Sequence, residues 1–144
     1  MSEAFYLRWA PSFLSLLRIM SALLFIAHGT QKLFNFPARP SPDGAASPPI
    51  DLFSLIGAAG VLEFVGGAFL LVGLFTRPVA FILSGMMAVA YFIAHHPRTF
   101  YPVNNGGDAA ILFCFIFLFL FFAGGGPLSV DTLFAKRRAE AAVG

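Results

Sequence analysis

A single carboxylate lies in the middle of a long apolar segment. Glu63 is near the centre of DLFSLIGAAGVLEFVGGAFLLVGLF, residues 51–75. A carboxylate at the centre of a bilayer costs about 2.5–3.5 kcal/mol on insertion scales. Glu63 is therefore expected to be partnered, to be neutral or to take part in chemistry.

Polar residues in the first apolar segment are spaced to share one helix face. Arg18, Ser21, His28 and Lys32 follow one another at intervals of three, seven and four residues. This face is expected to point into a helix bundle, although Lys32 could instead extend from the helix end to the membrane surface. By depth, Glu63 can reach Arg18 on one side or His28 on the other. A structural Glu–Arg pair and a proton-exchanging or ligand-contacting glutamate both stay open.

The later segments add further groups that could do chemistry. Tyr91 and His95 share a stripe in the third segment, and His96 follows at its end. Asp108 comes just before the fourth apolar run and is expected to be the N-cap of that helix. Together with the first helix, these segments predict an outward-opening pocket, and such pockets are where bundles hold ligands. Its expected polar residues are His28, Gln31, Lys32, His95, His96, Arg98, Asn104 and Asp108, with Glu63 beneath them.

The composition indicates the elements that must position these groups. Of the 144 residues, 58% are hydrophobic and 11% are charged, whereas soluble domains have about 45–50% apolar and about 25% charged residues. The sequence predicts one all-α membrane domain over residues 1–144, a four-transmembrane-helix up-down bundle. The expected spans are 12–34, 52–75, 78–95 and 108–124, and Gly60, Gly66 and Gly67 are expected to pack helices closely.

The connections between spans give an orientation. Residues 35–51 contain five prolines and predict a stiff loop, 96–107 form a second polar loop, and Thr76-Arg77-Pro78 predicts a tight turn. Five Lys and Arg residues lie on the side of the termini and three on the other. The positive-inside rule then places both termini in the cytoplasm of a bacterium, with the chain in its inner membrane. Cleavage of a signal peptide after Gly29 is less favoured, because apolar residues continue through Phe34.

Several kinds of chemistry are excluded by the residues present. One cysteine, Cys114, rules out an internal disulfide, a CxxC motif and a multi-cysteine metal site within this sequence. We predict no metal site. The net charge of +2 and the lack of a basic, aromatic surface exclude a nucleic-acid partner.

Four stretches of the sequence resemble the DoxX family of small bacterial membrane proteins. They are RIMSALLFIAHGTQKLF, GAAGVLEFVGGAFLLVGLFTRPVA, MMAVAYFIAHHP and NGGDAAILFCFIFLFLFFAGGGPLSVD, and the likeness runs from residue 16 to 134. Loop 35–51 looks like a local elaboration. The positions that match are Arg18, His28, Gly29, Lys32, Glu63, Gly66, Gly67, Gly73, Arg77, His95, His96, Gly107 and Asp108.

The resemblance implies four transmembrane helices and a link to redox complexes, because the family is named after a subunit of a thiosulfate:quinone oxidoreductase. Other members are linked to complexes that handle thiol and oxidative stress. The candidate residues for contacting a quinone or relaying protons are Arg18, His28, Lys32, Glu63, His95, His96 and Asp108.

Two functions remain open on this basis. The chain could be a redox-linked subunit that binds a quinone while a partner supplies the redox cofactor, since the sequence carries none of its own. It could equally be a non-catalytic accessory or assembly subunit docked on a larger membrane complex, and whether it is an enzyme is open. The expected partners are lipid, other membrane or redox subunits, and a second copy of the chain. A carrier and a haem-binding bundle with His28 and His95 are minor alternatives.

Overall fold

The computed structural model describes residues 2–39 and 50–142, and within those ranges every regular element is a helix. The elements are α1 (Glu3–Phe34), α2 (Leu55–Val72), α3 (Thr76–Ala90), the π-helical turn η1 (Tyr91–His95), α4 (Pro102–Asn105), α5 (Asp108–Ala123) and α6 (Val130–Ala141). The predicted all-α class is confirmed for the described residues.

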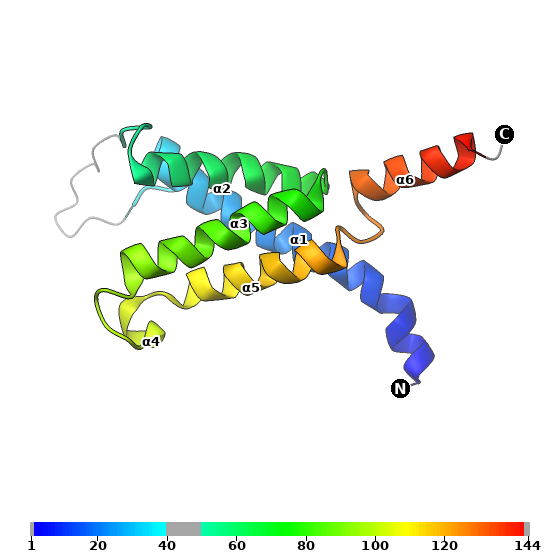
Figure 1. Ribbon diagram of the computed structural model, residues 1–144, viewed down its shortest axis with the longest axis horizontal. Coiled ribbons are helices and arrows are strands. Elements are labelled where there is room, and N and C mark those ends of the chain that lie inside the picture. Colours follow the sequence, from blue (N-terminus) through cyan, green and yellow to red (C-terminus); the bar gives the residue numbers. More distant parts are fainter. Residues whose placement is uncertain (1, 40–49, 143–144) are drawn as a thin grey trace.

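The four longest apolar elements form an elongated bundle (Figure 1). Within it, α1 packs chiefly against α2, and α3 packs chiefly against α5. The start of α1 and the whole of α6 project from the same end of this bundle, so both termini lie at that end (Figure 1). The start of α2 and the short helix α4 lie at the opposite end, which we call the loop end.

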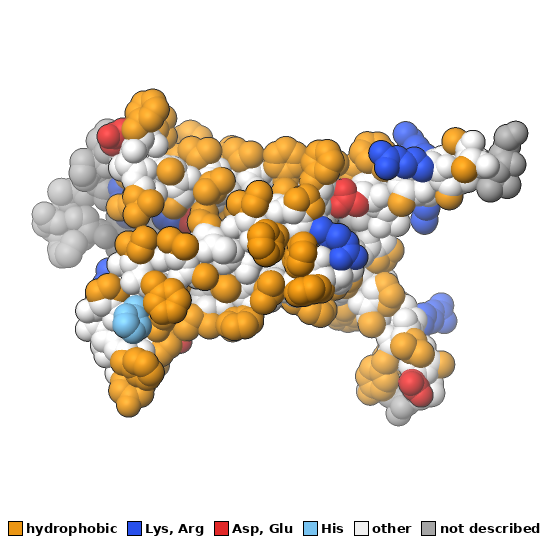
Figure 2. All heavy atoms as spheres, in the orientation of Figure 1, with side chains coloured by type: hydrophobic (Ala, Val, Ile, Leu, Met, Phe, Trp, Pro, Cys, Tyr) orange, Lys and Arg blue, Asp and Glu red, His pale blue; other side chains and the backbone are white. Residues whose placement is uncertain are grey.

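Three of the elements are long and apolar enough to cross a membrane: Glu3–Phe34, Leu55–Val72 and the continuous run Thr76–His95. The fourth, α5, is apolar but has only 16 residues, a length of about 24 Å at 1.5 Å per residue. Large apolar side chains cover the bundle surface between the two ends (Figure 2). Such a surface suits lipid rather than water.

The core is formed by one buried cluster that joins all four long elements. Phe25 of α1 lies edge-on to Phe117 of α5, with ring centroids 4.8 Å apart. Leu70 of α2 and Leu83 of α3 complete its centre, each at most 1% exposed. This cluster holds the α1–α2 pair and the α3–α5 pair together.

Several helix ends differ from the predicted ones. The first helix begins at Glu3 rather than near residue 12, and it continues through Pro11. The turn between α2 and α3 is Gly73–Phe75 rather than Thr76–Pro78, because Pro78 is accommodated in the first turn of α3, where a missing N–H costs little. Of the predicted stiff loop 35–51, residues 40–49 lie outside the described part.

Asp108 is not the N-cap of α5, contrary to the prediction. Gly107 occupies that position and Asp108 is the first helical residue, with an exposed side chain. Its carboxylate still lies at the positive end of the helix dipole. Asp131, in the first turn of α6, accepts hydrogen bonds from the backbone N–H groups of Phe75 and Thr76, at 2.8 Å each, and so caps α3.

Small residues allow α1 and α2 to approach closely. A Cβ atom on Gly29 would lie 2.6 Å from the backbone nitrogen of Phe64, and one on Gly67 would lie 2.7 Å from a side-chain carbon of Ile26. Gly60 faces Lys32 in the same interface, whereas Gly66 faces Leu83 of α3. The backbones therefore touch where a larger residue would separate the helices.

We expect Gly29→Ala to weaken this interface, because the new methyl group would meet backbone that cannot rotate away. The expected loss is on the order of 1–3 kcal/mol, as for overpacked cores. Gly85→Ala is the matched control, since a Cβ there meets nothing within 4 Å. Thermal unfolding in detergent should show a lower melting temperature for Gly29→Ala only. Equal melting of both variants would contradict the close contact.

Candidate functional site

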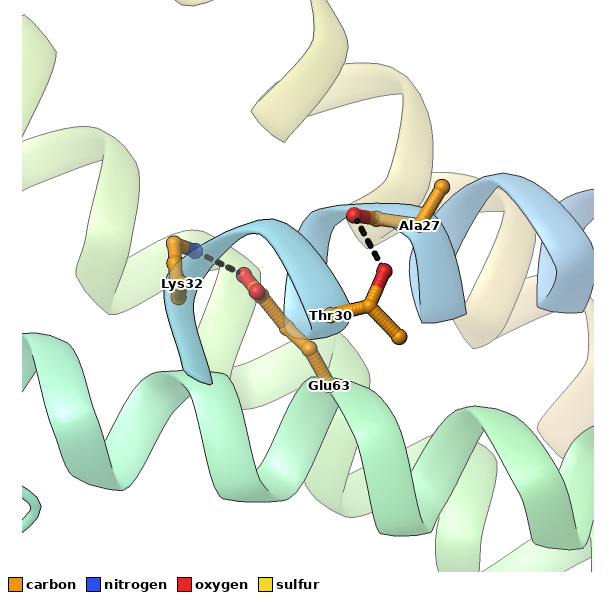
Figure 3. Close-up of polar contacts among 4 residues, drawn as sticks. All are labelled: Ala27, Thr30, Lys32 and Glu63. Carbon is orange, nitrogen blue, oxygen red and sulfur yellow. Dashed lines mark hydrogen bonds and ion pairs between the residues drawn. The ribbon is translucent and has the colours of Figure 1, made fainter. Parts of the chain in front are cut away.

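Glu63 is buried and paired with Lys32 (Figure 3). The Lys32 ammonium donates to the Oε1 atom of Glu63. The Glu63 side chain is 3% exposed and that of Lys32 is 29% exposed, so the carboxylate lies inside the bundle while the lysine reaches its edge. A buried carboxylate needs such a partner to remain charged.

The register of α1 against α2 explains why Lys32, rather than Arg18, is the partner. The two helices are antiparallel, with Gly29 beside Phe64 and Gly67 beside Ile26. Arg18 precedes Lys32 by 14 residues, which is about 21 Å along a helix. The considered Glu63–Arg18 pair is therefore wrong.

Arg18 instead links α1 to the last turn of α2 and to the loop before α6. Its guanidinium is fully buried and donates to the carbonyl oxygens of Leu70, Leu71, Gly125 and Leu128. Leu70 and Leu71 are in the last turn of α2, where carbonyls lack the regular α-helical partner and a cation is favoured, although Leu70 also accepts from the Gly73 N–H at 3.1 Å. The neighbouring Gly73 has φ +70°, and a Cβ there would lie 2.9 Å from the guanidinium carbon. Arg18 thus has a structural role away from Glu63.

A cavity of about 450 Å³ lies between the helices at the loop end, beside the ion pair. Most of its wall is apolar, from residues such as Phe25, Met87, Ile93 and Phe113. Four of the predicted site residues line it: His28, Lys32, Glu63 and His95. This size is within the range of about 300–1,000 Å³ that is typical of small-molecule sites.

The other predicted site residues lie elsewhere. Arg18 lies near the other end of the bundle, and neither His96 nor Asp108 is among the residues that line the cavity. Both of these side chains are exposed. The seven candidates therefore separate into four at the cavity and three away from it.

The two histidines at the cavity, His28 and His95, have different contacts. The His28 ring lies edge-on to Phe113, with centroids 6.1 Å apart. The Nδ1 atom of His95 lies 3.1 Å from the backbone oxygen of Asn105. Since a carbonyl can only accept, Nδ1 must donate its proton there, which leaves Nε2 as the acceptor of the neutral ring.

Asn105 positions this wall and was not singled out from the sequence. It is 2% exposed, its amide nitrogen donates to the Thr99 oxygen at 2.8 Å, and its side-chain oxygen accepts from the N–H of Gly107 at 2.7 Å. A buried amide with its own turn partners fixes the loop between η1 and α5. The only available signal was the Asn-Asn-Gly-Gly run, which does not tell which asparagine is buried.

Glu63, which lines the cavity, has one carboxylate oxygen without a partner in the described part of the chain. The Oε2 atom of Glu63 is buried and makes no hydrogen bond within the described residues. An unsatisfied buried polar atom costs about 1–3 kcal/mol. Because Glu63 lines the cavity, a ligand bound there could complete its bonding.

The described residues hold no cluster of three His, Cys, Asp or Glu side chains that could bind a metal ion. A second, larger cavity of about 760 Å³ lies at the end of the termini, beside Arg77 and Asp131. There Arg77 donates to the oxygens of Phe121 and Phe122 at the end of α5, and Asp131 caps α3. Two of its three charged lining residues, Arg77 and Asp131 but not Lys136, are thus already used to terminate helices.

The long apolar helices and the apolar bundle surface define a multi-pass helical membrane protein. The family model described as DoxX matches residues 13–96, more than half of the chain. The chain belongs to the DoxX family. It is also 42% identical to an uncharacterized protein of Haemophilus influenzae over 134 residues, which cover 90% of this chain and 96% of that protein. No solved structure matches it.

Proposed function

We propose that this DoxX protein is a membrane subunit that binds a quinone-type molecule in the loop-end cavity and serves a redox complex. The observation that carries the proposal is the buried Glu63 side chain, which lines an apolar cavity and has one carboxylate oxygen without a partner among the described residues. A flat apolar ring with polar oxygens suits such a site, where apolar walls bind the ring and few polar groups orient it.

The residues at the cavity could serve both recognition and proton transfer. Lys32 and His28 can donate hydrogen bonds to a carbonyl oxygen, and Glu63 and His95 can accept protons. Intramembrane groups of this kind commonly mark ligand and proton pathways. The sequence contains one cysteine and no dinucleotide fingerprint, so the redox centre is assigned to a partner subunit.

The proposed arrangement has α5 as a fourth membrane span and both termini in the cytoplasm. Both termini lie at one end of the bundle (Figure 1), as an even number of passes requires. Arg77 and the basic run Lys136–Arg138 also belong to that end, since Asp131 of α6 contacts the start of α3. A short span such as α5 can be matched by local thinning of the bilayer. The cavity then faces the periplasmic half of a bacterial inner membrane.

Purification from native membranes in mild detergent tests this proposal. Mass spectrometry should find fixed redox subunits and close to one quinone for each chain, and Glu63→Ala should lose the quinone while keeping the subunits. Asp108→Ala is the matched control, because that carboxylate is exposed at the same end outside the cavity. Fixed partners without any quinone would instead favour an accessory or assembly subunit.

A further inference from the structure

The unpartnered oxygen of Glu63, a residue that lines the cavity, is a hydrogen-bond acceptor, and this restricts which ligands can satisfy it. A carboxylate that is paired with an ammonium group carries no proton on either oxygen, so Oε2 of Glu63 can only accept. A carbonyl oxygen from a ligand cannot satisfy it, because both atoms would be acceptors. Only a ligand with an O–H or N–H group can.

The other polar groups of the wall do not offset this restriction. The Nδ1–H of His95 is already used by the backbone oxygen of Asn105, so the neutral form of the ring would offer the cavity only an acceptor, Nε2. Lys32 and His28 do retain donor protons, but the Lys32 side chain is 29% exposed and His28 is exposed. Their protons therefore have access to other partners, whereas the Oε2 atom of Glu63 is buried and has no partner within the described residues.

We propose that the cavity selects the reduced, hydroxyl-bearing form of its ligand, a hydroquinone, over the oxidised quinone. This inference rests on the proposed function and adds to it the redox form that is bound. One phenolic hydroxyl donates to Oε2 of Glu63, and the ring lies against the apolar wall. The gain of a hydrogen bond to a buried charged acceptor favours the hydroquinone by about tenfold.

A redox titration of quinone bound to the protein in nanodiscs tests the preference. Short-chain benzoquinone and naphthoquinone analogues are each equilibrated with loaded and with empty nanodiscs. Tighter binding of the reduced form raises the reduction potential of the bound couple, by about 30 mV for a tenfold preference in a two-electron reaction. We expect this upward shift with the wild-type protein for at least one analogue.

Three variants test whether Glu63 causes the preference for the hydroquinone. Glu63→Gln replaces an acceptor by an amide that can donate to a quinone carbonyl, so the upward shift should vanish or reverse. The double variant Lys32→Met with Glu63→Gln should behave in the same way, and it leaves no unpaired charge if the single variant does not fold. Asp108→Asn, outside the cavity, should keep the wild-type shift.

The outcomes separate this inference from the proposed function. Binding of the quinone as tight as that of the hydroquinone, or tighter, in the wild-type protein would overturn the inference and leave the proposed function intact. An upward shift that survives in both Glu63 variants would also overturn it. Binding of neither form of either analogue above the level of empty nanodiscs would overturn the proposed function itself.

Discussion

Replacement of Arg18 by methionine is expected to destabilise the protein more than any other single change of a charged residue. The guanidinium donates to four carbonyl oxygens from the end of α2 and the loop before α6. Methionine would remove all four of these charge-assisted bonds, at a cost of at least about 3 kcal/mol, although Leu70 and Gly125 would keep a second donor in the Gly73 N–H and the Ser15 hydroxyl. We expect a melting temperature lower by about 10 °C, measured in detergent by loss of the monodisperse species.

Two variants serve as controls for Arg18→Met. Arg18→Lys keeps the charge but offers fewer donors in a less rigid arrangement, so its melting temperature should be intermediate. Arg8→Met removes an exposed cation from the same helix and should change stability by no more than about 0.5 kcal/mol. Wild-type melting of Arg18→Met would show that the guanidinium does not hold these segments together.

The second large effect is expected at Lys32. Lys32→Met would leave Glu63 buried without its cation, which should cost on the order of 3 kcal/mol. Glu63→Met should cost less, because the remaining lysine is 29% exposed and can turn towards the surface. The double variant should recover much of the loss, since an apolar pair of similar volume can replace a buried ion pair.

A double-mutant cycle measures this coupling directly. The unfolding free energies of the wild type, the two single variants and the double variant give the interaction energy. We expect coupling well above the value of about 0.2–1 kcal/mol that is typical of exposed ion pairs. Strictly additive single effects would mean that Lys32 and Glu63 do not stabilise each other in the folded protein.

The sequence predicted the helical class and the approximate positions of the apolar segments, because these depend on composition and local pattern. It also identified Glu63 as a residue that needs a partner, since a carboxylate in an apolar run is costly wherever it lies. Four of the seven candidate residues line one cavity, as expected when polar positions on several helices face the bundle interior.

The partner of Glu63 could not be predicted in the same way. It depends on the register between α1 and α2, which is set by the contact of Gly29 with Phe64 and of Gly67 with Ile26. Such contacts join residues far apart in sequence, and the spacing of polar residues along one helix does not encode them. The position of Asp108 was missed for a local reason: Gly107 takes the cap and buried Asn105 orders the preceding turn.

Photoaffinity labelling with an azidoquinone tests the central claim most directly, which is that a quinone-type molecule occupies the cavity beside Glu63. The probe is added to the protein in nanodiscs, with and without an excess of unlabelled quinone, and labelled peptides are mapped by mass spectrometry. We predict labelling on the segments that line the cavity, residues 25–32, 55–63, 86–95 and 106–113, suppressed by the competitor. Labelling confined to outward-facing residues of α5 such as Phe115 and Phe119, unaffected by the competitor, would contradict the claim.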